Sequence, residues 1–420
     1  MADALGVLLG STVRTWGRPN PLGTLAYLQS DGLWVRDLPD GRPRRLVESA
    51  KLASPRFSST GDWLAFLDRG QVRVASRDGG RAYAVGQGSS ASKQPGFSWA
   101  AGSDDLLVED DTGLTIFASR DAWTRPVRAL PGASLPAAFR PGGRDMVFGD
   151  EIPSRESVRI GRLCRLDSDR PEAPPLVLVS EPSVAQVPCA FAPDGEILFW
   201  RDPSFSASFM ADGLELFAIP AAGGAARSLG VTTLVHDDTL AVSPDRRTLA
   251  VAAGGGRNHW EGKRIALLDL PGKALSYLTE ERVCAVSPSW SPDGLRLAYS
   301  SAPSPATARG VAGGEGAKRL LSRRRIWTQN VSGGAPSART ADPHYRDEKP
   351  LWSADGKHIL FCRMDAAEAV TLWLMGAQGD NPRQAAGPLY CDPGPLGAED
   401  TWFGYYGYID WRARFDWYRG

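Results

Sequence analysis

Three of the four histidines in the 420-residue sequence stand in polar loops that also carry acidic residues. Imidazole and carboxylate groups are common protein ligands of divalent transition metals. Converging side chains of His236, His259 and His344 would therefore form a metal site for a lyase or hydrolase acting on a saccharide-like polar substrate. None of the loops has the paired-ligand spacing of a strong metal motif, so ordinary polar contacts are the alternative. The candidate ligand-binding residues are His236, Asp237, Asp238, His259, Trp260, His344, Tyr345, Arg346 and Asp347.

The run PHYRDEKP at residues 343–350 allows two interpretations. It could contact a ligand at the mouth of a channel, or it could be a connector held by internal salt bridges. Charges of mixed sign in a short run pair readily, which favours the connector. Residues 301–325, rich in Pro, Ala and Gly before LLSRRR, are typical of a flexible loop that could act as a lid.

Motifs for covalent chemistry are absent from the sequence. It contains no GxSxG nucleophile elbow, and the glycine-rich stretch at 310–319 lacks the Lys-Ser/Thr ending of a phosphate loop. Adjacent carboxylates such as Asp104 and Asp105 would point to opposite faces of a strand. We therefore assign no catalytic residue and expect no cofactor, with the divalent metal as the alternative.

An internal repeat predicts the elements that position these loops. An apolar or aromatic residue, a turn like Ser-Pro-Asp-Gly and a strongly apolar strand recur about every 40 residues, plus insertions. The clearest copies are WSPDGLRLAYS from Trp290 and WSADGKHILFC from Trp352. Other copies begin at Phe57, Trp99, Phe139, Phe191 and Val242, and a degenerate first copy spans residues 20–47.

The chemistry of the turn explains its residues. Pro292 would fix φ, Asp293 can bond the local backbone, and Gly294 can adopt a positive φ, so that two strands reverse tightly. The following strands, such as LAFL and ILFC, are continuous apolar runs, which indicates burial on both faces. Each unit supplies four strands. Eight units predict an all-β fold, a single β-propeller with eight blades, or seven if the first copy only completes another unit.

This WSPDG-plus-strand signature resembles the repeat of TolB-type propellers. The resemblance covers almost the whole chain, from about residue 20 to residue 387. It implies a propeller that binds proteins or ligands and lies outside the cytoplasm. Because the shared motif is structural, the resemblance assigns no catalytic residues. The function expected from it is a non-catalytic scaffold, whose partner is a protein or a polar small-molecule or saccharide ligand.

One face of the ring should carry the site. If the Ser-Pro-Asp-Gly turn joins the first and second strands from the centre, antiparallel connectivity places the second-to-third loops and the blade connectors on the opposite face. The insertions at 149–157, 201–213, 253–263 and 301–324 all fall there. Binding residues usually lie on loops held by a rigid scaffold. We name this surface the loop face and expect the ligand there.

The last residues form an aromatic tail, 388–420, after a lead-in at 1–19 and the propeller at 20–387. Nine aromatic residues lie between Trp402 and Tyr418. The 3-4-3 spacing of Tyr408, Trp411, Phe415 and Tyr418 predicts a short amphipathic helix. We expect the tail to dock on the ring and tie its ends together. The alternative is an aromatic surface for a partner or a sugar.

Composition excludes two classes of partner. The chain has 48 Lys+Arg and 48 Asp+Glu, and this balance argues against nucleic-acid binding. No apolar run approaches the roughly 20 residues that cross a bilayer, so no transmembrane segment is expected. The sequence as given starts without the basic region of a signal peptide. An extracytoplasmic location is therefore expected from the repeat resemblance alone.

Overall fold

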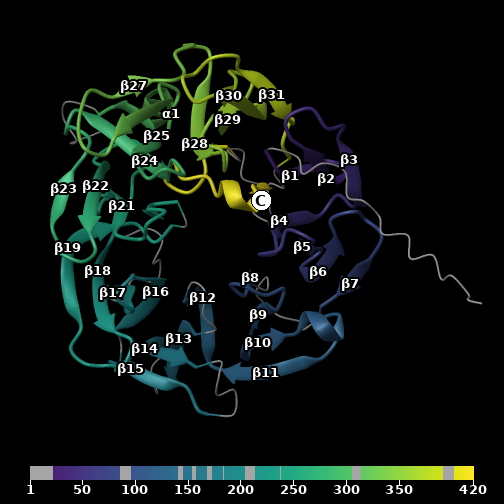
Figure 1. Ribbon diagram of the computed structural model, residues 1–420, viewed down its shortest axis with the longest axis vertical. Coiled ribbons are helices and arrows are strands. Elements are labelled where there is room, and N and C mark those ends of the chain that lie inside the picture. The colour runs from purple at the N-terminus through teal and green to yellow at the C-terminus, as the bar shows by residue number, and fades with distance from the viewer. Residues whose placement is uncertain are drawn as a thin grey trace, which may run out of the picture.

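The computed structural model describes residues 22–85, 96–140, 145–153, 158–167, 173–182, 184–203, 213–236, 238–304, 314–390 and 402–420. Within these ranges the regular structure is almost entirely β, with one α-helix, α1 (Glu315–Leu321), and two 3-10 segments, η1 (Ser119–Asp121) and η2 (Trp411–Ala413). Figure 1 shows the strands arranged as radial sheets around a central axis, in a closed ring. The prediction of a single β-propeller is confirmed.

Each blade is an antiparallel unit of four strands. Blade 1 contains β1 (Thr24–Gln29), β2 (Gly32–Asp37), β3 (Arg44–Glu48) and β32 (Phe415–Tyr418). Blade 2 contains β4 (Leu52–Phe57), β5 (Trp63–Asp68), β6 (Gln71–Ser76) and β7 (Ala82–Ala84). Blade 3 contains β8 (Gly96–Trp99), β9 (Leu106–Asp110), β10 (Gly113–Phe117) and β11 (Pro126–Pro131). Blade 4 contains β12 (Ala133–Phe139), β13 (Met146–Pro153), β14 (Val158–Leu166) and β15 (Leu176–Ser180), and blade 5 contains β16 (Ala185–Phe191), β17 (Glu196–Asp202), β18 (Leu214–Pro220) and β19 (Arg227–Thr233).

The remaining blades follow the same pattern. Blade 6 contains β20 (Leu240–Val242), β21 (Thr248–Ala253), β22 (Arg264–Asp269) and β23 (Leu275–Tyr277), blade 7 contains β24 (Val283–Trp290), β25 (Arg296–Pro303), β26 (Arg325–Asn330) and β27 (Ser337–Ala338), and blade 8 contains β28 (Arg346–Trp352), β29 (His358–Met364), β30 (Val370–Gly376) and β31 (Arg383–Ala386). Blades 5 and 6 share one sheet through the single pair Thr233↔Ala253. The described chain thus has eight four-stranded blades, as the repeat predicts.

The repeated turn forms as its residue types dictate. In blade 7, the Ser291 hydroxyl donates to Asp293, and the same Asp293 carboxylate accepts the Leu295 N–H at 3.0 Å. Gly294 has a φ of +71°, the left-handed conformation that favours glycine. These bonds close the reversal between β24 and β25. The turn therefore joins the first and second strands of the blade and lies opposite the loop face.

The apolar core is divided among the interfaces between neighbouring blades. Trp352, Ile359 and Phe361 of blade 8 are fully buried and pack with Ala298 and Ile326 of blade 7. Because each blade is covered on both faces, the middle of its second strand is a continuous apolar run, such as LAFL in β5 and ILF in β29. Burying a side chain of this size contributes about 1.5–3 kcal/mol, so each interface holds its two blades in place.

The C-terminal strand closes the ring. β32 pairs antiparallel with β1, from Thr24↔Tyr418 to Tyr27↔Phe415, and is the innermost strand of blade 1. The Trp417 indole N–H donates to the Leu22 carbonyl at 2.8 Å. The Tyr418 ring also packs against Phe57 of blade 2, with 5.8 Å between ring centroids. The tail therefore docks on the ring, as expected.

The amphipathic helix expected over residues 408–418 is wrong. The chain forms η2 at Trp411–Ala413 and then the strand β32. Phe415 and Trp417 are buried while the intervening Asp416 is half-exposed, which is the alternation of a strand. Pairing with the open edge of β1 gives one side of the β32 backbone regular hydrogen-bond partners, and this tertiary contact overrides the helical spacing.

Loop-face cluster as the candidate functional site

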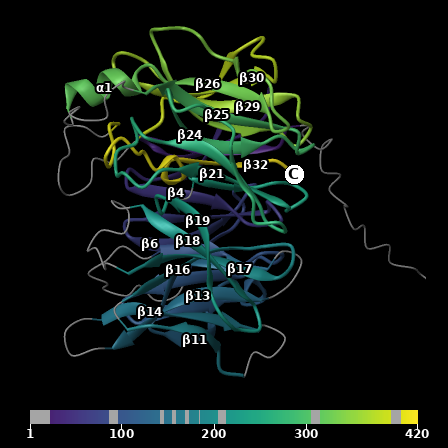
Figure 2. The same cartoon turned by 90° about the vertical axis from the view of Figure 1, so that its left-hand side faces the viewer.

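Residues from the loops of neighbouring blades and from the tail meet at the centre of the loop face. His236 and Asp238 precede β20, His259 lies between β21 and β22, and Arg324 comes directly before β26. All of these positions are second-to-third loops or blade connectors, so they share the loop face. In Figure 2, α1 projects beyond the strands at one end of the ring. Asp237, another candidate, lies outside the described residues.

Two of the three candidate imidazoles meet on a tyrosine of the tail. The His236 and Tyr408 rings stack, with centroids 3.8 Å apart and planes 12° apart. His259 approaches both, at 5.2 Å from His236 and 5.1 Å from Tyr408. All three residues are at least 92% buried. The two histidines therefore contact the tail through Tyr408 and are not open to a ligand.

The electrostatics of this stack favour a neutral His259. Burial and the nearby charge of Arg324 lower the pKa of His259 well below its usual value. Its Nε2 atom has no hydrogen-bond partner among the described residues. The backbone of His259 holds the loops together, since its N–H donates to the Tyr406 carbonyl at 2.9 Å and its own carbonyl accepts from Arg324.

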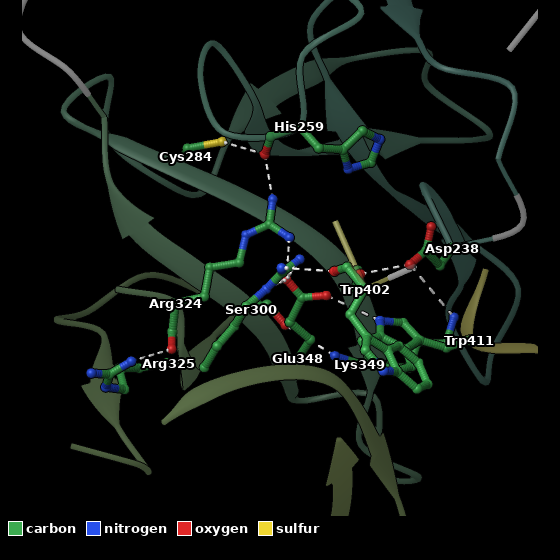
Figure 3. Close-up of polar contacts among 12 residues, drawn as sticks. Asp238, His259, Cys284, Ser300, Arg324, Arg325, Glu348, Lys349, Trp402 and Trp411 are labelled. Atoms are coloured by element: carbon green, nitrogen blue, oxygen red, sulfur yellow. Dashed lines mark hydrogen bonds and ion pairs between the residues drawn. The ribbon is translucent and has the colours of Figure 1, made fainter. Parts of the chain in front are cut away.

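A buried ion cluster lies beside the stack (Figure 3). Glu348 accepts from Arg324 Nη1 at 2.5 Å and from Arg346 Nε at 2.7 Å, and its second oxygen accepts from the Trp411 indole at 3.0 Å. Arg346 also donates to the Trp402 carbonyl at 3.3 Å. Burial alone would raise the pKa of Glu348, but the charges of Arg346 and Arg324 outweigh it and lower this pKa to about 2. The cluster thus joins blades 7 and 8 to the tail.

A second set of polar contacts joins the segment before β20 to the inner strands of blades 7 and 8. Asp238 accepts from the Ser287 hydroxyl at 2.7 Å and lies 3.8 Å from the Lys349 ammonium. Ser287 and Lys349 have φ values of +55° and +54° at register shifts in β24 and β28. The Lys349 N–H donates to the Ser300 hydroxyl at 3.1 Å. These bonds hold the two strained residues in place.

Only residues 343–345 of the run at 343–350 connect blades 7 and 8, and the rest belongs to the inner strand β28, so the connector interpretation is correct only for the start of the run. Asp347 is fully buried and accepts two bonds from Arg363, at 2.8 and 3.0 Å. Arg363 in turn lies over the Tyr345 ring, 4.6 Å from its centroid. The candidates Tyr345, Arg346 and Asp347 are therefore engaged in holding blade 8.

His344 does not join the other two imidazoles. Its side chain is 85% exposed and pairs with Asp342, with 2.9 Å between Nδ1 and the carboxylate. Within the described ranges, no group of three or more His, Cys, Asp or Glu side chains has metal-binding geometry. The structure thus brings together His236 and His259 only, and the converging three-histidine set does not form.

The last candidate, Trp260, belongs to a small apolar core on the loop face. It packs with Ala317 and Leu321 of α1, while Phe403 and Tyr406 of the tail cover this core. An open hollow of about 540 Å³ lies beside the helix, lined by Gly316, Arg319, Leu320, Ser322 and Arg323. Tyr405 is 45% exposed at the adjoining tail, and Arg257 lies 5.3 Å from the Tyr406 ring centroid.

Sequence reasoning missed the residues that organise this face. Arg324, Tyr408 and Trp411 were not among the candidates, although they form its centre. The density of aromatic residues in the tail was the available signal. A docked tail needs side chains to contact, and the polar loops of the loop face could have been expected to provide them.

Similar solved structures identify the fold class. Oligopeptidase B from Leishmania major matches with a TM-score of 0.50 and 10% identity, over 80% of this chain and 48% of that chain. TolB from Acinetobacter baumannii matches with a TM-score of 0.35 and 13% identity, over 87% of this chain and 67% of that chain. No family model and no curated protein matches the sequence. At these identities the likeness shows the propeller fold, and TolB is among the similar structures.

Proposed function

We propose that this chain is a non-catalytic binding propeller that recognises a protein or polar ligand through its loop face. One observation carries the proposal. The charged and aromatic groups at the centre of that face are used to fix loops of three blades and the tail into one surface, as the Arg324–Glu348–Arg346 cluster shows. Rigid loops of this kind present a preformed contact area, which lowers the entropic cost of binding.

The outer part of this surface supplies the contacts. Tyr405 is exposed beside Tyr406, and Arg319 and Arg323 of the α1 region point to solvent. Tyrosine and arginine side chains are enriched where proteins bind partners, because each combines a large contact area with hydrogen bonding. The metal-dependent enzyme that the sequence left open has no comparable support, since its imidazoles are buried or dispersed. The repeat resemblance supports an extracytoplasmic location.

Site-specific photo-crosslinking tests this proposal. A benzophenone amino acid would replace Tyr405 on the loop face or Leu295, which is 63% exposed at the opposite turn. We expect the Tyr405 probe to give discrete crosslinked partners in an extract of the source cells and the Leu295 probe to give none of them. Equal crosslinking from both faces, or crosslinking from Leu295 alone, would contradict the assignment of the loop face.

The described residues contain no helix that is both long and apolar enough to pass through a membrane.

A further inference from the structure

The basic residues around α1 divide into two groups. The segment from Lys318 to Arg325 holds five positive charges. Lys318 lies 3.9 Å from Glu368, and Arg324 is paired with buried Glu348. Arg325 donates to backbone carbonyls, including that of Tyr345 at 2.6 Å. Three of the five cations therefore have partners within the described residues.

Arg319 and Arg323 are the remaining two, and they behave differently. Both side chains are exposed, and neither guanidinium has a carboxylate or hydrogen-bond partner among the described residues. Elsewhere on the described surface, arginines commonly pair with a nearby carboxylate, as Arg45 does with Asp31 at 3.0 Å and Arg383 with Asp40 at 2.8 Å. In a chain of zero net charge, this leaves a local positive excess at one place on the loop face.

The two arginines border the hollow beside α1. They lie four residues apart, so their side chains emerge on the same side of the helical turn. The turn is fixed, because the Ser322 hydroxyl donates to the Arg319 carbonyl at 3.0 Å and the Arg323 N–H donates to the Leu320 carbonyl at 3.2 Å. Half-buried Leu320 contributes an apolar surface between them. The hollow thus offers two guanidinium forks around an apolar floor.

This chemistry fits a peptide better than a sugar. Guanidinium groups bind carboxylates through paired N–H donors, and the apolar floor suits an aliphatic side chain. The described lining contains no aromatic ring on which a sugar could stack and no amide or carboxylate side chain to bond its hydroxyls. Alternating acidic and apolar side chains would match both features.

We propose that the hollow formed by Arg319, Leu320 and Arg323 binds an acidic segment of a partner protein, in which carboxylates flank an aliphatic residue. The proposal rests on the proposed function, because it names the chemistry of the partner that the loop face recognises. It places recognition at α1 and not at the buried histidines.

The test measures binding of a fluorescein-labelled decapeptide in which glutamate alternates with leucine, by fluorescence anisotropy. We expect saturable binding that weakens as salt is raised from about 50 mM to about 0.3 M, since exposed charges are screened. Arg319→Glu combined with Arg323→Glu should weaken binding by at least about tenfold. The matched control combines Arg120→Glu with Arg383→Glu, which reverses two other exposed arginines and should leave binding unchanged.

A neutral double variant, a folding control and two control ligands complete the experiment. Arg319→Gln with Arg323→Gln removes the charges without adding repulsion and should also weaken binding, and thermal unfolding confirms that each variant is folded. A peptide with glutamine in place of glutamate should not bind. Absence of peptide binding, or equal binding by wild type and the Arg319/Arg323 variants, would overturn the proposal. Tighter binding of polygalacturonate at the same arginines would also overturn it, because the ligand would then be an anionic saccharide.

Failure of the acidic-segment proposal can be distinguished from failure of the proposed function. If Tyr405 crosslinks a partner while the arginine variants bind the peptide normally, the loop face is retained and only the acidic-segment assignment is lost.

Discussion

Replacing Glu348 by Gln should destabilise the protein strongly. The carboxylate is 4% exposed and lies between two buried guanidinium groups, so its removal leaves Arg324 and Arg346 without a countercharge. Breaking a buried ion pair in this way costs about 3–5 kcal/mol. The lowered pKa gives a similar figure. A fall from the ordinary 4.5 to about 2 corresponds to about 3 kcal/mol of preferential stabilisation of the charged form.

Urea unfolding followed by far-ultraviolet circular dichroism, with thermal unfolding in parallel, measures this loss. An unfolding entropy of about 2.1 cal/mol/K per residue converts 3–5 kcal/mol into a fall in Tm of about 3–6 °C for the 420-residue chain. The matched control is Glu315→Gln at an exposed position of α1, which should change stability by less than about 0.5 kcal/mol.

The pH dependence provides a second check. Because the folded pKa of Glu348 lies below the unfolded one, its stabilisation is fully present above pH 4.5 and is lost as the pH falls toward about 2. The difference between wild type and Glu348→Gln should therefore shrink across that range. A difference below about 1 kcal/mol at neutral pH, or one that grows in acid, would refute the assignment of Glu348 as the countercharge.

Three further predictions concern the same fold. Lowering the pH from about 6.5 to about 5.5 should reduce the free energy of unfolding by about 1 kcal/mol. The reason is that His259 becomes protonated in the unfolded chain but stays neutral in the folded protein, where its pKa is lowered. His259→Gln should lack this loss in urea titrations, and an unchanged loss would contradict it. Deleting residues 415–420 should lower the free energy of unfolding by at least about 3 kcal/mol in the same assay, because the buried contacts of Phe415 and Trp417 are lost. A truncated chain of full stability would refute ring closure by β32. Gly61→Ala should lower Tm more than Gly294→Ala. The new Cβ would lie 2.3 Å from the Tyr418 ring in the first variant and 3.7 Å from Pro244 in the second. Equal effects on Tm would argue against the close packing of Gly61 on Tyr418.

The repeat could be predicted from sequence because its chemistry is local. Asp293 accepts a hydrogen bond from the N–H two residues later, and Gly294 adopts a positive φ that few other residues tolerate. The turn is therefore determined by residues that are adjacent in the sequence. The blade count followed from counting copies. The shared face of His236 and His259 followed from antiparallel connectivity, which needs only the order of strands.

The centre of the loop face could not be predicted in the same way. Arg323, Arg324 and Arg325 are identical in type, yet only Arg324 is fully buried, because Glu348 and the His259 carbonyl lie within reach of that one guanidinium. That choice depends on how loops of different blades meet. The tail was misassigned as a helix for the same reason, since its conformation is decided by the open edge of β1, almost four hundred residues earlier in the chain.

The pairing of β32 with β1 also constrains how the protein can be made. Synthesis produces β1 before β32, with about 390 residues between them. At about 5–20 residues per second, blade 1 waits roughly 20–80 s for its innermost strand. During that time the inner edge of β1, with Leu25 and Tyr27, has no strand beside it and can pair with other chains. A chain that lacks β32, because its synthesis has not reached that strand or has stopped before it, is therefore an open ring whose first blade is incomplete.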